Sequence, residues 1–206
     1  MKNILKNVLR TIYPYGIPVL LNRGEVASIL NARTLTGEGA EVGVKCGQFS
    51  EYLLDHWKGR RLYAIDPWRE FAREVYHDAD NVNQQEQELN YGITTRRLAR
   101  FGERAVVLRM TSEEAAQTIL DGSLDFAYLD ARQDYESEKE DIGLWYPKIR
   151  PGGILCGHDY LDGEMNGTRF GVKRAVDEFA QAQGLPVKVT LREPVYKSWL
   201  VVKPGV

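Results

Sequence analysis

The 206-residue sequence predicts an α/β fold with a doubly wound, mostly parallel sheet that ends in an antiparallel hairpin. Short apolar runs alternate with helix-periodic segments along most of the chain, which is typical of strands joined by crossover helices. A glycine-containing turn follows the first run, where such folds bind nucleosides. Two strand-like runs close the chain with a short connection between them, and this order favours a hairpin.

Five apolar-rich runs are expected to form the parallel strands, because glycine, charge or proline bounds each of them: Ala40 to Val44, Arg61 to Ile65, Ala105 to Met110, Leu124 to Leu129 and Gly153 to Gly157. The C-terminal part predicts a helix from Gly171 to Gln183 that Gly184 ends, then strands from Val187 to Leu191 and Ser198 to Val202. Residues 23–31 predict a short helix before the sheet. We therefore expect one domain at 36–206, preceded by a helical arm at 1–35.

Composition excludes several classes of function. The net charge is −2 and the lysines and arginines are scattered, which argues against a nucleic-acid partner. The apolar face of residues 1–15 is too interrupted for a membrane span or a signal peptide, so we expect it to cover its own domain or to form a homo-oligomer contact. Cys46 and Cys156 lack the spacing of a zinc site, and a reduced, cytoplasmic protein is the simpler expectation.

The first motif is Glu41-x-Gly43-x-x-x-Gly47, with Asp66 at the end of the next predicted strand. The pattern lacks the G-x-G-x-x-G spacing that lets a helix N-terminus approach a pyrophosphate. Asp66 is placed to accept hydrogen bonds from two ribose hydroxyls, and Glu41 suits a ligand with a cationic end. Residues 111–112, Thr-Ser, open the helix after the third strand with a capping box and are expected beside an adenine ring.

This first motif resembles that of the class I S-adenosylmethionine-dependent methyltransferases, which have a Rossmann-like fold. A second constellation extends the resemblance: L-D-A-x-x-x-Y-E, then P-G-G-x-x-x-G-H-D-Y, then G-V-K-R-A-V-D-E-F. It is similar to small bacterial O-methyltransferases that act on sugars and other small hydroxyl compounds, and it covers roughly residues 38–204. The resemblance implies that 36–206 is a methyltransferase domain, with S-adenosylmethionine as cofactor and a small-molecule hydroxyl as acceptor.

The same resemblance implies a divalent metal, such as Mg²⁺, at Asp130, His158 and Asp159. These residues follow the fourth and fifth predicted strands and should converge at the cofactor edge, where Asp130 also belongs to the cofactor set. Three residues after Asp130, relatives that need a general base commonly have His or Lys, whereas this chain has Gln133. Glutamine does not accept a proton at neutral pH.

The nearest alternative proton acceptors are His158 and Asp134, although Asp134 also suits the N-cap of the helix that begins near Tyr135. Two further functions stay open at this point. A non-catalytic or weakly active S-adenosylmethionine-binding protein would explain Gln133. A dinucleotide-binding oxidoreductase would share the sheet and Asp66, but it would require a different glycine pattern.

Overall fold

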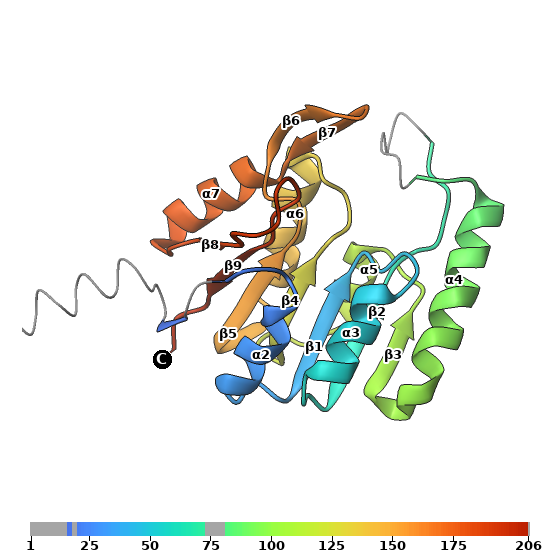
Figure 1. Ribbon diagram of the computed structural model, residues 1–206, viewed down its shortest axis with the longest axis horizontal. Coiled ribbons are helices and arrows are strands. Elements are labelled where there is room, and N and C mark those ends of the chain that lie inside the picture. Colours follow the sequence, from blue (N-terminus) through green and yellow to red (C-terminus); the bar gives the residue numbers. More distant parts are fainter. Residues whose placement is uncertain (1–15, 18–19, 73–80, 206) are drawn as a thin grey trace, which may run out of the picture.

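The computed structural model describes residues 16–17, 20–72 and 81–205, and it shows a central sheet between two layers of helices (Figure 1). The seven strands lie in the order β3-β2-β1-β4-β5-β9-β8. They are β1 (Glu38–Val42), β2 (Arg61–Ile65), β3 (Ala105–Leu108), β4 (Leu124–Leu129), β5 (Ile149–Gly157), β8 (Lys188–Val189) and β9 (Trp199–Val202). The predicted strands are all present, and β5 begins earlier than expected.

Pairing directions confirm the mostly parallel sheet. Strands β1 to β5 pair in parallel, whereas β9 runs antiparallel to both β5 and β8 and so forms the predicted C-terminal hairpin. Backbone hydrogen bonds continue past the strand ends: the Asp130 N–H donates to the Val42 carbonyl at 2.8 Å, and the His158 N–H to the Leu129 carbonyl at 2.9 Å. The carboxyl ends of the parallel strands are thereby held in one row.

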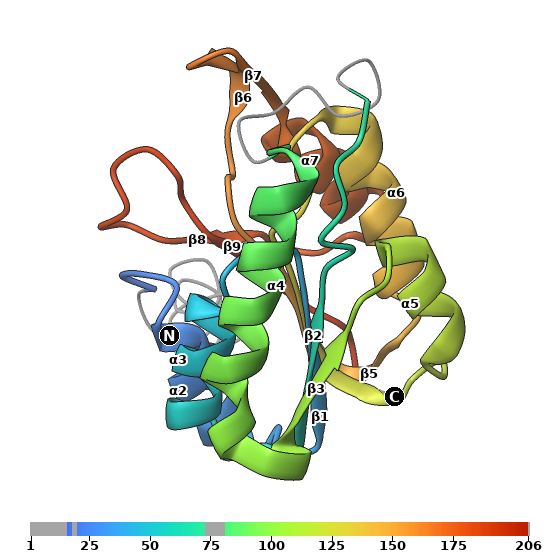
Figure 2. The same cartoon turned by 90° about the vertical axis from the view of Figure 1, so that its right-hand side faces the viewer.

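Helices cover both faces of the sheet (Figure 2). On one face lie α2 (Glu25–Ala32), α3 (Gln48–His56) and α4 (Gln84–Leu98), the last continued by a 3₁₀ segment, η2 (Ala99–Arg104). On the other lie α5 (Ser112–Thr118), α6 (Tyr135–Trp145) and α7 (Val172–Gln183). The helix predicted at 23–31 corresponds to α2, and the helix predicted within residues 1–15 lies outside the described residues. No helix in the described ranges is long and apolar enough to cross a membrane.

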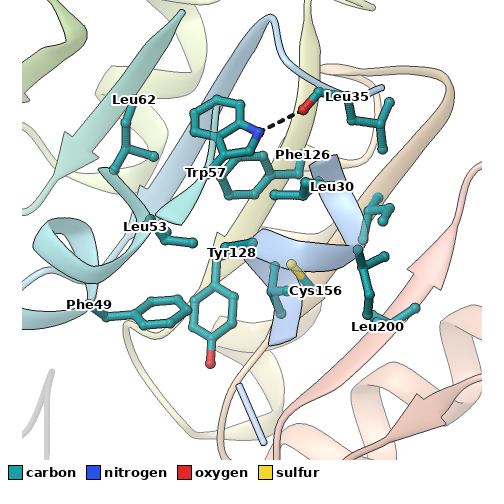
Figure 3. Close-up of a cluster of buried hydrophobic side chains, with 14 of the residues drawn as sticks. Leu30, Leu35, Phe49, Leu53, Trp57, Leu62, Phe126, Tyr128, Cys156 and Leu200 are labelled. Carbon is teal, nitrogen blue, oxygen red and sulfur yellow. Dashed lines mark hydrogen bonds between the residues drawn. The ribbon is translucent and has the colours of Figure 1, made fainter. Parts of the chain in front are cut away.

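The core beneath α2 and α3 is built around aromatic side chains (Figure 3). The Trp57 indole N–H donates to the Leu35 carbonyl at 2.6 Å, and the ring meets Phe126 edge-on at 4.9 Å between centroids. Both side chains are almost fully buried. Burying one such side chain contributes about 1.5–3 kcal/mol, so this cluster fixes α3 against β1 and β4.

The structure adds a second, two-stranded sheet that the sequence analysis does not predict. Strands β6 (Asp162–Met165) and β7 (Thr168–Gly171) form a hairpin around Asn166 and Gly167, whose φ angles are 54° and 81°. Positive φ at both central residues is the geometry of a type I′ turn, for which Asn-Gly is the favoured pair. The hairpin projects at the carboxyl edge of the main sheet (Figure 1).

A glycine lets the turn after β1 approach the end of β4. Gly43 has φ of 88°, and a Cβ placed on it would lie 2.0 Å from the Asp130 carbonyl oxygen. Both the backbone conformation and the space exclude any larger residue at this position.

We expect Gly43→Ala to lower the free energy of unfolding by roughly 2 kcal/mol more than Gly122→Ala. Gly122 is the matched control, because its φ is 68° but nothing lies within 4 Å of the added Cβ. The difference therefore isolates the collision with Asp130 from the backbone strain, and urea denaturation of both variants measures it. Equal losses of unfolding free energy in the two variants would show that Gly43 does not pack as closely against the Asp130 carbonyl as described.

Candidate active site

A cavity of about 320 Å³ lies at the carboxyl edge of the parallel strands. Its wall contains most of the residues predicted to hold a cofactor: Gly43, Asp66, Thr111, Ser112 and Asp130. Glu41 and Gly47 are not part of this wall. The turn after β1 and the segments after β2, β3 and β4 all contribute to the cavity, as expected for a ligand site in a parallel sheet.

The Asp66 carboxylate orders the turn that carries Gly43. One oxygen accepts hydrogen bonds from the Val44 and Lys45 backbone N–H groups at 3.0 and 2.9 Å, and the other accepts from the Trp68 N–H at 2.8 Å. A carboxylate has about four acceptor positions, so a ribose hydroxyl would share a group that also holds the loop. Asp66 thus holds the turn in place and also lines the cavity.

Gly47 and Glu41 support the same turn from beneath. Gly47 is the N-cap of α3 with φ of 72°, and an added Cβ would lie 3.0 Å from the Thr94 methyl group. Glu41 is 1% exposed and accepts a hydrogen bond from the Ser50 hydroxyl in the first turn of α3. Burial raises the pKa of Glu41 to about 8, so this carboxyl is largely neutral at pH 7. Direct contact of either residue with a cofactor stays a prediction.

The start of α5 forms the opposite wall. Thr111 accepts a hydrogen bond from the Glu114 N–H at 3.2 Å while the Glu114 carboxylate accepts one from the Thr111 N–H, which confirms the capping box. The Ser112 hydroxyl donates to Asp141 and accepts from the Trp145 indole at 2.8 Å. Asp141 lines the cavity, and burial raises its pKa to about 6. Sequence reasoning missed Asp141, because only its place on the buried face of α6 distinguishes it from the neighbouring acids.

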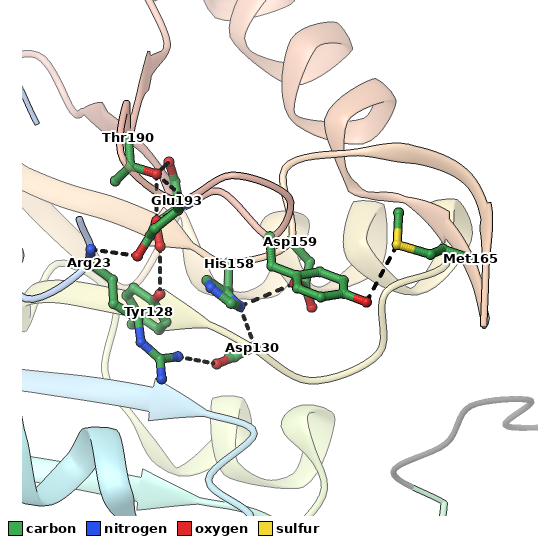
Figure 4. A network of polar contacts seen from close by, with 10 residues as sticks. Arg23, Tyr128, Asp130, His158, Asp159, Met165, Thr190 and Glu193 are labelled. Atoms are coloured by element: carbon green, nitrogen blue, oxygen red, sulfur yellow. Dashed lines mark hydrogen bonds and ion pairs between the residues drawn. The ribbon is translucent and has the colours of Figure 1, made fainter. Parts of the chain in front are cut away.

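Asp130, His158 and Asp159 come together as predicted (Figure 4). Their ligand atoms lie within 4.8 Å of one another. His158 Nδ1 lies 3.1 Å from Asp159 Oδ1 and 3.7 Å from Asp130 Oδ1. Burial lowers the pKa of His158, but the hydrogen bond to Asp159 and the charges of both aspartates outweigh it, and the net pKa is raised. Asp159 has φ of 52°, an unusual angle for a residue other than glycine.

Arg23 joins this cluster without any signal in the sequence (Figure 4). Its guanidinium lies 3.5 Å from Asp130 Oδ2 and 4.9 Å from the centre of the Phe49 ring. Its backbone N–H donates to Glu193 at 2.8 Å, and Glu193 also accepts from the Ser198 N–H at 2.9 Å. The segment before α2 and the loop between β8 and β9 are thereby tied together beside Asp130.

The two residues predicted near the proton-transfer step differ in their surroundings. Asp134 is the N-cap of α6, and its carboxylate accepts from the Ser137 N–H at 3.1 Å and from the Ser137 hydroxyl. The capping role is confirmed, and a role as base stays a prediction. Gln133 does not line the cavity. Its backbone carbonyl accepts from the Gly171 N–H of β7 at 2.9 Å, whereas its side-chain oxygen is buried without a hydrogen-bond partner among the described residues.

The residues after Asp66 contribute one side chain to the core and another to the cavity wall. Trp68 is fully buried, and its indole donates to the Lys45 carbonyl at 2.8 Å, so it supports the turn from within the core. Phe71 lines the cavity. The next residues of this segment, 73–80, lie outside the described residues.

The raised pKa of Glu41 predicts a dependence of stability on pH. Its folded pKa of about 8 lies above the ordinary 4.5, so between these values the unfolded chain releases the proton first and stability falls as pH rises. We expect Glu41→Gln to remove this loss and to raise the melting temperature at pH 8 much more than at pH 5, by roughly 2–4 °C for each kcal/mol recovered. Glu164→Gln, at an exposed position, is the control. The same gain at both pH values would contradict a neutral buried Glu41.

Comparison with known proteins places this arrangement in a family. The family described as "Methyltransferase domain" matches residues 40–160. An uncharacterized protein of Sinorhizobium fredii, y4gI, is 30% identical over 149 residues, which are 69% of this chain and 14% of that protein. The chain therefore spans only a small part of this relative.

Solved structures share the fold at low sequence identity. A protein from Corynebacterium glutamicum has a TM-score of 0.63 at 16% identity, covering 89% of this chain and 81% of its own. An O-methyltransferase family protein from Burkholderia thailandensis has a TM-score of 0.62 at 13% identity, covering 88% and 55%. The 1,6-didemethyltoxoflavin-N1-methyltransferase of that organism, solved with bound S-adenosylhomocysteine, has a TM-score of 0.55 at 14% identity, covering 87% and 76%. The chain belongs to the class I S-adenosylmethionine-dependent methyltransferase family.

Proposed function

We propose that this protein transfers the methyl group of S-adenosylmethionine to a hydroxyl group of a small molecule, at the edge where the cavity meets Asp130, His158 and Asp159. The observation that carries the proposal is this juxtaposition of a nucleoside-sized cavity with a polar cluster, with Asp130 belonging to both. The sulfonium of the cofactor already activates the methyl carbon. The protein therefore has to align an acceptor oxygen with that carbon and to help remove its proton.

The cavity offers a place for each part of the cofactor. Asp66 and the turn at Gly43 suit the ribose, and Met110 with Ser112 suits the adenine. The methionine end then points toward Asp130, where a negative charge favours a sulfonium and an ammonium group. A dinucleotide would share the ribose contact with Asp66, but its pyrophosphate would need a G-x-G-x-x-G turn, which the turn at Gly43 lacks. The missing glycine pattern argues against the oxidoreductase alternative.

A divalent metal fits the second cluster by its donor set. Two carboxylates and one imidazole within 4.8 Å of one another are ligands that divalent ions such as Mg²⁺ or Mn²⁺ accept. When bound there, a metal would position the acceptor hydroxyl and lower its pKa. The Arg23 guanidinium, 3.5 Å from Asp130 Oδ2, would have to share that carboxylate with the ion.

Some group must accept the proton of the acceptor hydroxyl, and the Gln133 amide does not accept a proton at neutral pH. His158 is a candidate because it sits in the cluster, although its raised pKa means that it already tends to hold a proton. The Asp134 carboxylate is engaged by Ser137. A protein that binds the cofactor but turns over slowly is the alternative that these contacts favour.

The cofactor proposal is tested by ligand stabilisation. At a concentration one hundred times its Kd, S-adenosylhomocysteine should raise the melting temperature by roughly 5–10 °C, whereas NAD should leave it unchanged. Asp66→Asn should reduce the shift, because an amide accepts fewer hydrogen bonds than a carboxylate. Stabilisation by NAD together with no response to the adenosyl compounds would reject the proposed function.

The metal proposal predicts binding of Mn²⁺ or Mg²⁺ that calorimetry detects in the purified protein. Asp130→Asn and Asp159→Asn should each weaken it by more than the 10- to 100-fold that loss of a supporting group costs. Asp121→Asn is the control, since that aspartate is exposed and pairs with Lys148. Binding that survives both substitutions, or none in the wild type, would remove the metal from the proposal.

A further inference from the structure

Arg23 is held beside the polar cluster by its backbone. The Arg23 N–H donates to Glu193 in the loop between β8 and β9 at 2.8 Å. Two residues earlier, the Leu21 carbonyl accepts from the Arg192 N–H of the same loop at 2.9 Å. The position of the Arg23 backbone is therefore fixed by contacts that do not involve its side chain.

The Arg23 side chain reaches the cluster past two aromatic rings. Its guanidinium carbon lies 4.9 Å from the centre of the Phe49 ring, and that ring lies 4.5 Å from the ring of Tyr128. Both aromatic side chains are buried, and Tyr128 lies beside the arginine (Figure 4). A cation within about 6 Å of an aromatic face is attracted to it. These contacts hold the positive charge near Asp130 even when the ion pair between the two side chains opens.

Each oxygen of the Asp130 carboxylate faces a basic side chain (Figure 4). Oδ2 lies 3.5 Å from Arg23 Nη1, and Oδ1 lies 3.7 Å from His158 Nδ1. Charge-assisted hydrogen bonds from nitrogen to a carboxylate measure about 2.7–2.9 Å, so both of these contacts are loose. A loose ion pair balances charge without the strength of a short hydrogen bond, and another cation can replace it.

The charge of Arg23 opposes a divalent ion at the same carboxylate. Asp130, His158 and Asp159 offer ligand atoms within 4.8 Å of one another, which is the set that suits a metal. Arginine stays protonated and has no lone pair for a metal, so it competes with the ion and cannot join its ligands. The Arg23 and Asp130 side chains are only 38% and 21% exposed, and salt screens partly buried charges weakly. Arg23 therefore makes the binding of an ion at this cluster less favourable.

We propose that Arg23 and a divalent cation are alternative partners of Asp130, so that the metal binds by displacing the Arg23 guanidinium from Oδ2. The inference rests on the proposed function, because it takes Asp130, His158 and Asp159 as the metal ligands. In the metal-free protein, Arg23 neutralises Asp130 and holds the carboxylate at the sheet edge. Arg23 is thus a positioning residue that sets the metal affinity, and it lies outside the wall of the cofactor cavity.

Calorimetric titration with Mn²⁺ at fixed ionic strength tests this competition in the purified protein. Arg23→Gln should bind Mn²⁺ roughly tenfold more tightly than the wild type, because the repelling charge is gone. Arg23→Lys keeps the charge and should stay within about threefold of the wild-type Kd. A purely structural role of Arg23 predicts the opposite sign, since an Asp130 carboxylate that is no longer held in place would bind the metal more weakly.

Thermal unfolding of the same variants gives a second readout. Without metal, Arg23→Gln should melt at a lower temperature than the wild type, because Asp130 loses a partner and the Phe49 ring loses its cation. Saturating Mn²⁺ should then raise the melting temperature of Arg23→Gln by more than it raises that of the wild type.

The matched control is Arg60→Gln, which removes an arginine that pairs with Glu38 at 2.6 Å at the opposite end of β1. It makes the same change in net charge and should leave the Mn²⁺ affinity unaltered. Stabilisation by S-adenosylhomocysteine should be the same in the wild type, Arg23→Gln and Arg60→Gln, because neither arginine lines the cofactor cavity.

The inference is overturned, while the metal site stands, if Arg23→Gln binds Mn²⁺ no more tightly than the wild type. An equal gain in affinity in Arg23→Lys or in Arg60→Gln also overturns it, since the charge beside Asp130 would then not be the cause. Absence of Mn²⁺ binding in both the wild type and Arg23→Gln rejects the inference together with the metal. The response to S-adenosylhomocysteine decides separately whether the proposed methyl transfer stands.

Discussion

The contact between the turn after β1 and the end of β4 sets the geometry of the whole site. Gly43 lies so close to the Asp130 carbonyl that no side chain fits between them. Hydrogen bonds from Gly43 to the Ile65 carbonyl and from Asp130 to the Val42 carbonyl lock the two strand ends to their neighbours. Because Asp130 belongs both to the cavity and to the cluster with His158 and Asp159, this contact brings the cavity and the cluster together.

Acidic groups gather at this edge, and burial controls their charge. Burial raises the pKa values of Glu41 and Asp141 to about 8 and about 6, and it also raises the pKa of Glu138 well above its ordinary value. Asp66 accepts hydrogen bonds from three backbone N–H groups. A sheet edge that carries several carboxyl groups disfavours polyanionic ligands and favours a cationic one.

The sequence predicted the features that depend on local pattern. Apolar runs located β1 to β5, the capping box at Thr111 and the N-cap at Asp134 were read from residue type alone, and Asp130, His158 and Asp159 converge because parallel strands end at one edge. Local sequence patterns did not predict the long-range contacts. Arg23 reaches Asp130 through a loop whose path no local pattern describes, and Glu138 differs from the exposed Glu136 only by helix phase. The β6–β7 hairpin was missed although its Asn166-Gly167 pair is a recognised turn signal.

The start of α6 is tied both to strand β7 and to the wall of the cavity. Asp134 caps the helix, the Gln133 carbonyl bonds to the Gly171 N–H, and the buried face of the helix runs from Ser137 past Asp141 to the wall of the cavity. A side chain at position 133 is constrained by the backbone bond to β7, so replacing a base by glutamine there need not disturb the helix start. The Gln133 side-chain oxygen has no hydrogen-bond partner among the described residues, so it is the backbone bond to Gly171, and not the amide, that fixes this residue at the start of α6.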